Sequence, residues 1–304
     1  MQAEFRHDAL IYSDPQEFLE GTVPFLRAAL EAEEPALVAV GKEKTALLEG
    51  ELGEDAAAIR FADMEMLGRN PGRIIPFWRQ FVDESGGRPV RGIGEPVWPG
   101  REHHEIDECQ RHESLLNVAF GGTPAWSLLC PYDGRRLADE VLACVASSHQ
   151  HVAGKGLVEG TSGYLERRDC FDGELPGPPP VMDSLTFTRD RLAQVRRRVE
   201  HAAGLVGLSA DRTMDLVLAT SELAANSVVH GGGSGTLRVW RDADRLVVEV
   251  EDRGVIEEQL VGRVRPNNAQ LSGRGLWLAH QLCDLVQIRS GERGTTVRLH
   301  AAVA

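Results

Sequence analysis

Three residues between positions 222 and 230 have types and spacing that could do chemistry. Ala219, Glu222, Asn226 and His230 are three or four positions apart, so on a helix they share one face. That face would carry a carboxylate, an amide and an imidazole, which can accept protons and form hydrogen bonds. A polar, solvated helix face is the more frequent explanation of such a pattern. Whether these residues form a functional site therefore depends on other segments of the chain.

Three later segments carry a compatible pattern. Glu249 to Gly254 ends a β-rich run with Asp252 before a glycine, which suits an acceptor for an amino group beside backbone that a ligand approaches closely. Ser272 to Leu278 opens a helical run with two glycines, whose free N–H groups predict a phosphate cradle. Gly294 begins a strand with the hydroxyls of Thr295 and Thr296. Each signal is weak alone.

Apolar periodicity, capping residues and glycines predict the helices and strands that must position these residues. Apolar residues from Leu192 to Val206 recur at helical spacing. A second helix should begin near Ser209, a good N-cap, and end at Gly231, where glycine can adopt the left-handed conformation. We then expect strands over 236–240 and 246–250, a loop over 254–273, a short helix over 276–283, and strands over 285–289 and 295–300.

In this order, the four segments resemble the nucleotide-binding boxes of the Bergerat ATPase fold of histidine kinases and gyrase. Glu222-Leu-x-x-Asn226, His230-Gly231 and Gly273-Arg274-Gly275-Leu276 look most like anti-sigma factor kinases, which phosphorylate a serine on an anti-anti-sigma protein. The resemblance implies a two-layer α/β sandwich with a mixed sheet over residues 184–304.

The resemblance also implies roles for residues of these boxes. Asn226 would coordinate Mg²⁺, and Glu222 would be the general base. Asp252 would receive the adenine amino group of ATP, and the loop from Val255 to Ser272 would be a lid. The remaining implied nucleotide-binding residues are His230, Gly254, Gly273, Arg274, Gly275, Leu276 and Thr295.

The implied function is a serine kinase that binds ATP and Mg²⁺, phosphorylates an anti-anti-sigma (STAS-type) partner and thereby controls a sigma factor. Relatives commonly form homodimers. Val255-Ile256 stands where many relatives have a second glycine after Gly254, which leaves open a non-catalytic module that binds a sigma factor when ATP is bound. A sensor histidine kinase using His104 is the third alternative, but the Arg-Thr-Pro that normally follows such a histidine is missing.

The first part of the chain alternates strand and helix patterns, at 36–40, 42–50, 106–120 and 126–130. This alternation predicts an α/β layered domain with a mostly parallel sheet. Val40 to Thr45 hints at a phosphate loop but lacks the required pattern, so a simple strand-to-helix turn is expected. Segments 7–12, 94–101 and 129–133 resemble the MEDS sensory domain, which implies a RecA-like fold without a working phosphate loop.

Histidines in this domain raise the question of a metal. His104, Glu108 and His112 fall at helical spacing and could bind an ion. No completing ligand is evident around them, and helices of mixed charge usually face solvent, so a structural role is expected. His149 and His151 are interpreted in the same way.

Length and composition bound these expectations. The 304 residues suit two domains, which we place at 1–171 (sensory) and 184–304 (ATP-binding), joined by a linker rich in proline and glycine at 172–183. A net charge of -13 argues against direct nucleic-acid binding. Lack of a long apolar run or leader predicts a cytoplasmic protein that is not in a membrane. Five widely spaced cysteines predict reduced thiols.

Overall fold

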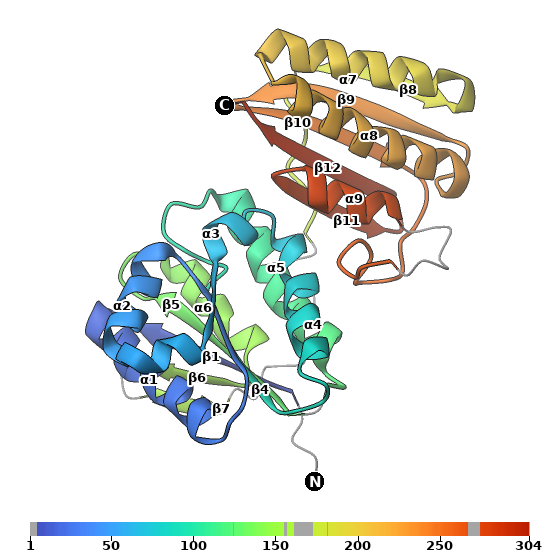
Figure 1. The fold of residues 1–304 in the computed structure, drawn as a ribbon. Coiled ribbons are helices and arrows are strands. Elements are labelled where there is room, and N and C mark those ends of the chain that lie inside the picture. The colour runs from blue at the N-terminus through green and yellow to red at the C-terminus, as the bar shows by residue number, and fades with distance from the viewer. Residues whose placement is uncertain are drawn as a thin grey trace. The chain divides into compact units, whose positions relative to one another are not determined.

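The computed structural model describes residues 5–123, 125–154, 157–160, 173–180, 182–266 and 274–303. The chain divides into two compact units, Met1–Phe171 and Asp172–Ala304, and each is described by itself (Figure 1). None of the described helices is long and apolar enough to span a membrane. The last part of the predicted loop, from Asn267 to Gly273, lies outside the described residues.

The first unit is built on a seven-stranded sheet with the order β3-β2-β4-β5-β1-β6-β7. All neighbouring pairs are parallel except β6 with β7, which confirms the mostly parallel sheet. The strands are β1 (Arg6–Tyr12), β2 (Ala36–Val40), β3 (Arg60–Asp63), β4 (Val90–Gly94), β5 (Trp126–Asp133), β6 (His151–Gly154) and β7 (Leu157–Gly160).

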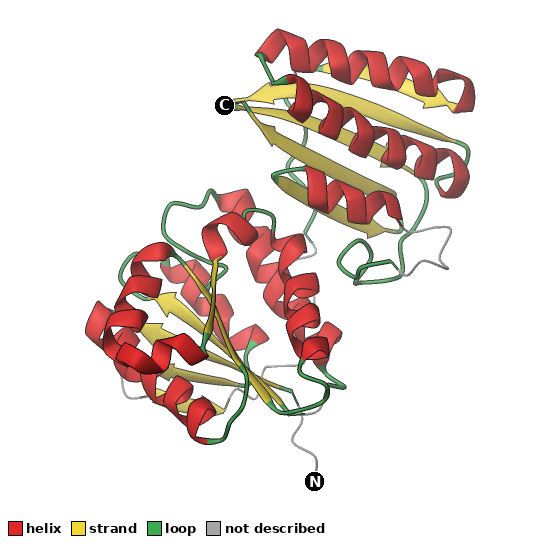
Figure 2. Ribbon diagram, viewed as in Figure 1, coloured by secondary structure: helices red, strands yellow, loops and turns green. Residues whose placement is uncertain are grey.

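Helices flank this sheet in two groups (Figure 2). The helix α1 packs on α2, whereas α5 packs on both α4 and α6. Their bounds are α1 (Pro15–Glu31), α2 (Lys42–Leu52), α3 (Met64–Leu67), α4 (Ile74–Glu84), α5 (His103–Phe120) and α6 (Asp139–Ser148). The layered α/β architecture expected from the alternating sequence pattern is confirmed. Short 3-10 turns occur at Gly53–Ala58, Pro71–Arg73 and Arg189–Arg191.

The second unit is a two-layer sandwich in which three helices cover one face of a five-stranded sheet (Figure 1). The strand order is β11-β12-β10-β9-β8. The strands are β8 (Asp183–Thr188), β9 (Ser234–Asp242), β10 (Arg245–Asp252), β11 (Leu285–Gly291) and β12 (Gly294–Ala302). The helices are α7 (Leu192–Val206), α8 (Ala210–His230) and α9 (Arg274–Leu282).

Every neighbouring strand pair in this sheet is antiparallel, which corrects the mixed pairing that we expected. The reason lies in the connections. Tight hairpins join β9 to β10 and β11 to β12, and the two helices between β8 and β9 return the chain to the end where β8 stopped. The connection through α9 does bring β11 into the direction of β10, but β12 lies between them.

The core of the second unit lies between the helices and the sheet. Its buried residues include Val195 and Val199 of α7, Leu216 and Leu223 of α8, and Val248 of β10. Burial of these side chains removes apolar surface from water, which is the main force that holds a helix on a sheet. The helices are thereby fixed against the sheet, and α8 and α9 are held side by side.

The segment rich in proline and glycine lies within the second unit. Arg298 donates a hydrogen bond to the Pro176 carbonyl oxygen over 2.8 Å, and Arg289 donates one to the Gly173 carbonyl oxygen over 2.8 Å. Both arginines belong to the sheet, so residues 173–180 are attached to it. The adjoining strand β8 was not expected from the sequence, although Leu185 and Phe187 alternate with exposed polar residues as a half-buried strand requires.

Candidate functional site

The helix α8 carries the polar stripe that the sequence singled out. Ser209 caps it by accepting a hydrogen bond from the Arg212 backbone N–H. Its buried face packs on the sheet, so Glu222 and Asn226 are half-buried at the border of the core, and His230 is exposed at the end of the helix. The predicted common face of these three side chains is therefore present along one helix.

Gly231 ends α8 for a reason other than the one expected. Its φ is -95°, so it does not adopt the left-handed conformation, which Gly232 and Gly233 adopt instead. A side-chain carbon built on Gly231 would lie 2.4 Å from Asp252 Cγ. Glycine is needed there because the end of α8 comes into contact with the end of β10, which brings Asp252 beside the polar stripe.

Asp252 is held in a fixed orientation by two hydrogen bonds. Ser227 Oγ donates to Asp252 Oδ2 over 2.6 Å, and the Gly254 backbone N–H donates to Oδ1 over 2.8 Å. Each carboxylate oxygen has a second lone pair. The residue can therefore accept a further hydrogen bond from a ligand without losing its supports.

Thr295 joins the start of β12 to the loop that follows β10. Its hydroxyl donates to the Gly254 carbonyl oxygen over 2.8 Å and lies 2.7 Å from Ser290 Oγ. Ser290 Oγ in turn accepts a hydrogen bond from the Ile256 N–H. These contacts fix the backbone at Gly254, where a side-chain carbon would lie 2.8 Å from the His230 carbonyl oxygen.

The helix α9 brings the glycine box to α8. A carbon built on Gly275 would lie 3.0 Å from Asn226 Nδ2 and 3.0 Å from Glu222 Cβ. Arg274, exposed, is the first residue of α9 and Leu276 is buried. Glu222, Asn226 and Gly275 are therefore immediate neighbours, while Gly273 and Ser272 lie outside the described residues.

The described part of the proposed lid, residues 255–266, turns back onto α9. Gly262 has φ +72°, and a carbon built there would lie 2.9 Å from Leu276 Cβ and 3.1 Å from His280 Cδ2. Only glycine tolerates both the conformation and the approach. The loop thus lies against the same helix that carries the glycine box.

A cavity of about 300 Å³ lies between these elements. One wall is apolar and is formed by residues from α8, the sheet, the loop and α9, and a few polar groups converge on it, as in typical sites for small ligands. The lining residues are Leu223, Asn226, Ser227, His230, Gly231, Val250, Asp252, Gly254, Val255, Ile256, Val261, Leu276, Thr295 and Val297.

The structure thus brings six of the sequence-predicted site residues to one cavity, with Gly275 and Glu222 in contact beside it. Sequence reasoning missed Ser227, which orients Asp252. No local signal pointed to this contact, because a serine on a helix can donate to the carbonyl oxygen four residues back, and Ser227 Oγ lies 3.1 Å from that of Leu223. It also missed the apolar wall, which is assembled from separate segments.

The phosphate-loop hint in the first unit is a strand-to-helix turn, as expected. The strand β2 ends at Val40 and α2 begins at Lys42. The nearby Lys44 lies 2.5 Å from Glu95 Oε1, and Glu95 is buried. Tyr12 also donates to this carboxylate over 3.0 Å, so the ammonium is engaged within the protein.

The metal candidate at His104, Glu108 and His112 does not assemble. Within the part of the chain that the structure describes, these three residues do not form a group of converging metal-ligand atoms. They follow one another along α5, and His104 is partly exposed while the other two are buried. The four described cysteines, Cys109, Cys130, Cys144 and Cys283, are free thiols, as predicted.

Comparison with known families gives a match for each unit. Residues 6–150 match the family model of the MEDS domain, the methanogen/methylotroph, DcmR sensory domain. Residues 185–301 match the model of the histidine kinase-like ATPase domain. Both expected resemblances are thereby confirmed. No curated protein matches the chain.

Three solved structures show limited similarity. The RsbU and RsbW domains of Rv1364c from Mycobacterium tuberculosis are 22% identical, with a TM-score of 0.30, over 40% of this chain and 32% of that one. The SiaB-SiaC complex from Pseudomonas aeruginosa is 14% identical, with a TM-score of 0.30, over 38% of this chain and 88% of that one. The histidine kinase AdeS from Acinetobacter baumannii is 10% identical, with a TM-score of 0.25, over 40% of this chain and 68% of that one.

The aligned part of this chain thus spans about a third of the Mycobacterium tuberculosis chain. At these TM-scores the three structures add nothing to the assignment of a function.

Proposed function

Because the chain consists of a MEDS domain followed by a histidine kinase-like ATPase domain, we propose that it is a regulatory serine kinase that uses ATP and Mg²⁺. The observation that carries the proposal is the contact of Gly275 with Glu222 and Asn226 beside the cavity lined by Asp252. Asn226 and Asp252 line this ligand-sized cavity, and Glu222 lies beside it.

The adenosine part of ATP would occupy the cavity of about 300 Å³. Asp252 would accept a hydrogen bond from the adenine amino group, since Ser227 and Gly254 hold its carboxylate in place. Thr295 and Gly254 would border the purine, and Val250 and Ile256 would supply apolar contact. His230 lies at the exposed end of this space.

The phosphates would extend from the cavity towards the start of α9. Arg274, Gly275 and Leu276 begin that helix, and unpaired N–H groups at a helix start attract anions. Asn226 would hold Mg²⁺ through its amide oxygen, because Mg²⁺ takes few protein ligands and completes its shell with phosphate oxygens and water. When bound, Mg²⁺ would neutralise charge that develops on the phosphates.

Glu222 would be the general base that accepts the proton of the incoming serine hydroxyl. It lies one helical turn before Asn226, half-buried, with Oε2 3.4 Å from a carbon built on Gly275. A carboxylate at this distance from the phosphate-binding backbone can reach a hydroxyl that approaches the terminal phosphate. Positioning and electrostatics would supply most of the remaining catalysis.

The proposed protein substrate is a serine of an anti-anti-sigma (STAS-type) partner, and the regulated target is a sigma factor. The MEDS domain would adjust this phosphorylation, and with it the control of the sigma factor, in response to a signal. A homodimer through the ATPase domain is part of the same proposal.

Transfer of labelled phosphate from magnesium ATP to a STAS-type protein tests the proposal. We expect acid-stable label on serine, lost in Glu222→Gln with nucleotide affinity retained. Glu200→Gln, on the exposed side of α7, is a control that should keep full transfer. Acid-labile label on the chain itself would point to histidine phosphorylation and contradict the proposal.

One observation favours a second candidate, a non-catalytic module that binds a sigma factor when ATP is bound. Val255 and Ile256 replace the expected second glycine, and the Ile256 N–H is bonded to Ser290. A loop fixed in this way would close less freely over the phosphates. Nucleotide-dependent sigma binding without any phosphate transfer would identify this candidate.

A further inference from the structure

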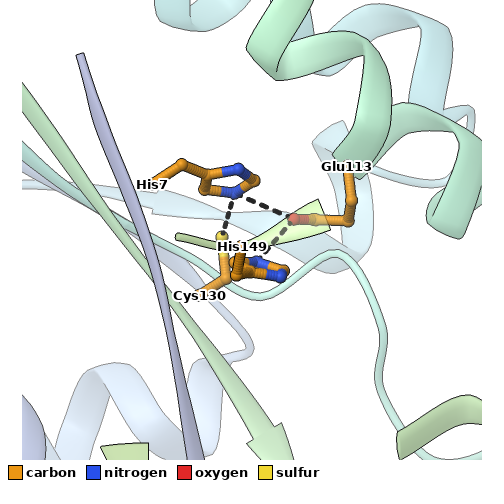
Figure 3. Close-up of side chains that lie close together, drawn as sticks. All are labelled: His7, Glu113, Cys130 and His149. Carbon is orange, nitrogen blue, oxygen red and sulfur yellow. Dashed lines mark hydrogen bonds and ion pairs between the residues drawn. The ribbon is translucent and has the colours of Figure 1, made fainter. Parts of the chain in front are cut away.

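Four side chains of the MEDS domain converge in its interior (Figure 3). They are His7 of β1, Glu113 of α5, Cys130 of β5 and His149, which follows α6. One ligand atom from each lies within 4.8 Å of all the others, and all four residues are buried. We propose that they form a binding site for one divalent metal ion of the zinc class, held by two imidazoles, a thiolate and a carboxylate.

The distances between the ligand atoms suit a tetrahedral ion. Glu113 Oε2 lies 3.1 Å from His7 Nε2 and 3.1 Å from His149 Nε2. His7 Nε2 lies 3.3 Å from Cys130 Sγ. Zinc bonds of about 2.0 to 2.3 Å in a tetrahedron place ligand atoms about 3.3 to 3.8 Å apart, so small shifts of the side chains would admit the ion.

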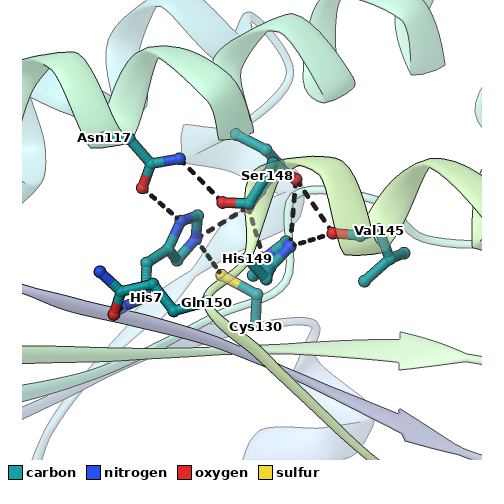
Figure 4. Close-up of polar contacts among 8 residues, drawn as sticks. His7, Asn117, Cys130, Val145, Ser148, His149 and Gln150 are labelled. Carbon is teal, nitrogen blue, oxygen red and sulfur yellow. Dashed lines mark hydrogen bonds and ion pairs between the residues drawn. The ribbon is translucent and has the colours of Figure 1, made fainter. Parts of the chain in front are cut away.

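Hydrogen bonds at the far ring nitrogen set the tautomer of His7 (Figure 4). Asn117 donates through its amide nitrogen to the Ser148 carbonyl oxygen over 2.8 Å, which leaves its amide oxygen facing His7 Nδ1 at 3.0 Å. That oxygen only accepts, so Nδ1 carries the hydrogen. In the neutral ring the lone pair is then on Nε2, which faces the cluster.

The tautomer of His149 is set in the same way. Its Nδ1 lies 2.8 Å from the Val145 carbonyl oxygen, which can only accept. The neutral ring therefore also presents the lone pair of Nε2 to Glu113. A ligand histidine that donates its other N–H to a carbonyl or amide oxygen is the usual supporting arrangement of metal sites in proteins.

The Glu113 carboxylate is buried at the centre of the cluster. Its Oε2 atom faces the Nε2 atoms of both imidazoles over 3.1 Å, and the side chains of Cys130 and Tyr132 also interact with it. A buried carboxylate is stabilised by a cation beside it. A cation at the centre would bind all four groups at once, with the Cys130 proton released to solvent as the thiolate forms.

The ligand types and surroundings indicate which ion fits. Nitrogen and sulfur ligands with one carboxylate select zinc-class ions, whereas Mg²⁺ and Ca²⁺ prefer oxygen. Phe5 stacks on His7 with ring centroids 5.7 Å apart, and Tyr132 meets His149 edge-on at 5.6 Å. Four protein ligands in a closed aromatic shell are typical of a structural site, which would bind two strands to α5 and the end of α6.

The full chain, stripped with a chelator and titrated with Zn²⁺, tests the site. We expect one Zn²⁺ per chain and a higher melting temperature of the MEDS domain. Loading with Co²⁺ should produce a thiolate-to-cobalt absorption band. Less than stoichiometric Zn²⁺, or a cobalt spectrum without that band, would overturn the proposal.

Matched variants locate the site. Glu113→Gln and Cys130→Ser should each weaken Zn²⁺ binding at least tenfold. Glu108→Gln on the same helix and Cys109→Ser are buried controls outside the cluster, and they should bind Zn²⁺ like the parent chain. Equal affinity in Glu113→Gln, or equal loss in the controls, would refute the assignment.

Folding and function are separated by further readouts. Near-ultraviolet circular dichroism reports whether each variant folds, and the cobalt band of the parent chain reports thiolate ligation even where a variant does not fold. ATP binding by the second unit should be unchanged in all four variants. Failure of the kinase proposal would therefore leave this test intact.

Discussion

Gly275 and Asn226 approach so closely that a carbon added to the glycine would lie 3.0 Å from the amide nitrogen of the asparagine. This contact joins α9 to α8 at the point where the proposed phosphate and Mg²⁺ sites meet. The glycine is favoured here by packing, because a side chain would push Asn226 or Glu222 aside, and not by its backbone conformation, since its φ is not positive.

Gly275→Ala should weaken ATP binding about tenfold or more, which corresponds to about 1.4 kcal/mol. The added methyl group would displace the side chain of Asn226, which lines the cavity, or that of Glu222 beside it. Isothermal titration with magnesium ATP measures the change. Gly204→Ala is the matched control, because Gly204 is a helical glycine with open space around it, and it should bind ATP normally and be more stable by about 0.4 to 1 kcal/mol.

Asp252→Asn should weaken ATP binding by about 10- to 150-fold, since a hydrogen bond to a charged group contributes about 1.5 to 3 kcal/mol. The amide can still accept from Ser227, so the fold should persist. Titration with ATP and with GTP separates loss of adenine recognition from general damage. Asp244→Asn, in the exposed turn between β9 and β10, is the control, and an equal loss there would argue against the assigned role.

The sequence predicted the second unit well where local signals coincide. The cap at Ser209, the helical stripe and the glycine boxes are each encoded within a few neighbouring residues, so α8 and the order of elements could be read directly. Pairing direction could not be read, because it depends on which strands become neighbours. The position of β12 between β10 and β11 makes the sheet antiparallel, and no local pattern reports that order.

The four-residue cluster of the MEDS domain could not be predicted from local sequence patterns either. His7, Glu113, Cys130 and His149 come from four elements, and no spacing rule connects them. Helical spacing instead directed attention to His112, the immediate neighbour of Glu113 on α5. The parallel pairing of β1 with β5, which places Ala9 beside Cys130, brings His7 near Cys130, and the packing of α5 on α6 adds Glu113 and His149.

Lys44→Met should lower the free energy of unfolding of the first unit by about 3 kcal/mol at pH 7, because it leaves Glu95 as a buried charge without its cation. Burial raises the pKa of Glu95, against the opposing effects of Lys44 and Tyr12. Lys42→Met is the control, because Lys42 is exposed and lies 3.7 Å from Asp63, and such surface pairs contribute at most about 1 kcal/mol.

The sign of the pH dependence follows from the raised pKa of Glu95. The folded state holds the carboxyl proton more tightly, so stability is greatest below the unfolded pKa of about 4.3 and falls as pH rises through the folded value. Without Lys44 the folded pKa rises further. Denaturant unfolding should therefore show a larger loss in Lys44→Met at pH 7 than at pH 4, and an equal loss at both would contradict the explanation.

Glu249→Gln should destabilise the second unit by about 3 kcal/mol. Glu249 is buried and accepts hydrogen bonds from Arg298 over 2.6 Å and from Arg238 over 2.8 Å, so the change leaves the buried Arg298 facing an amide that cannot neutralise it. Denaturant unfolding of the ATPase domain measures the loss. Glu251→Gln is the control on the same strand, because this half-exposed carboxylate pairs with Arg238 at the surface and should cost at most about 1 kcal/mol. Equal losses in the two variants would show that burial of the ion pair does not determine its contribution.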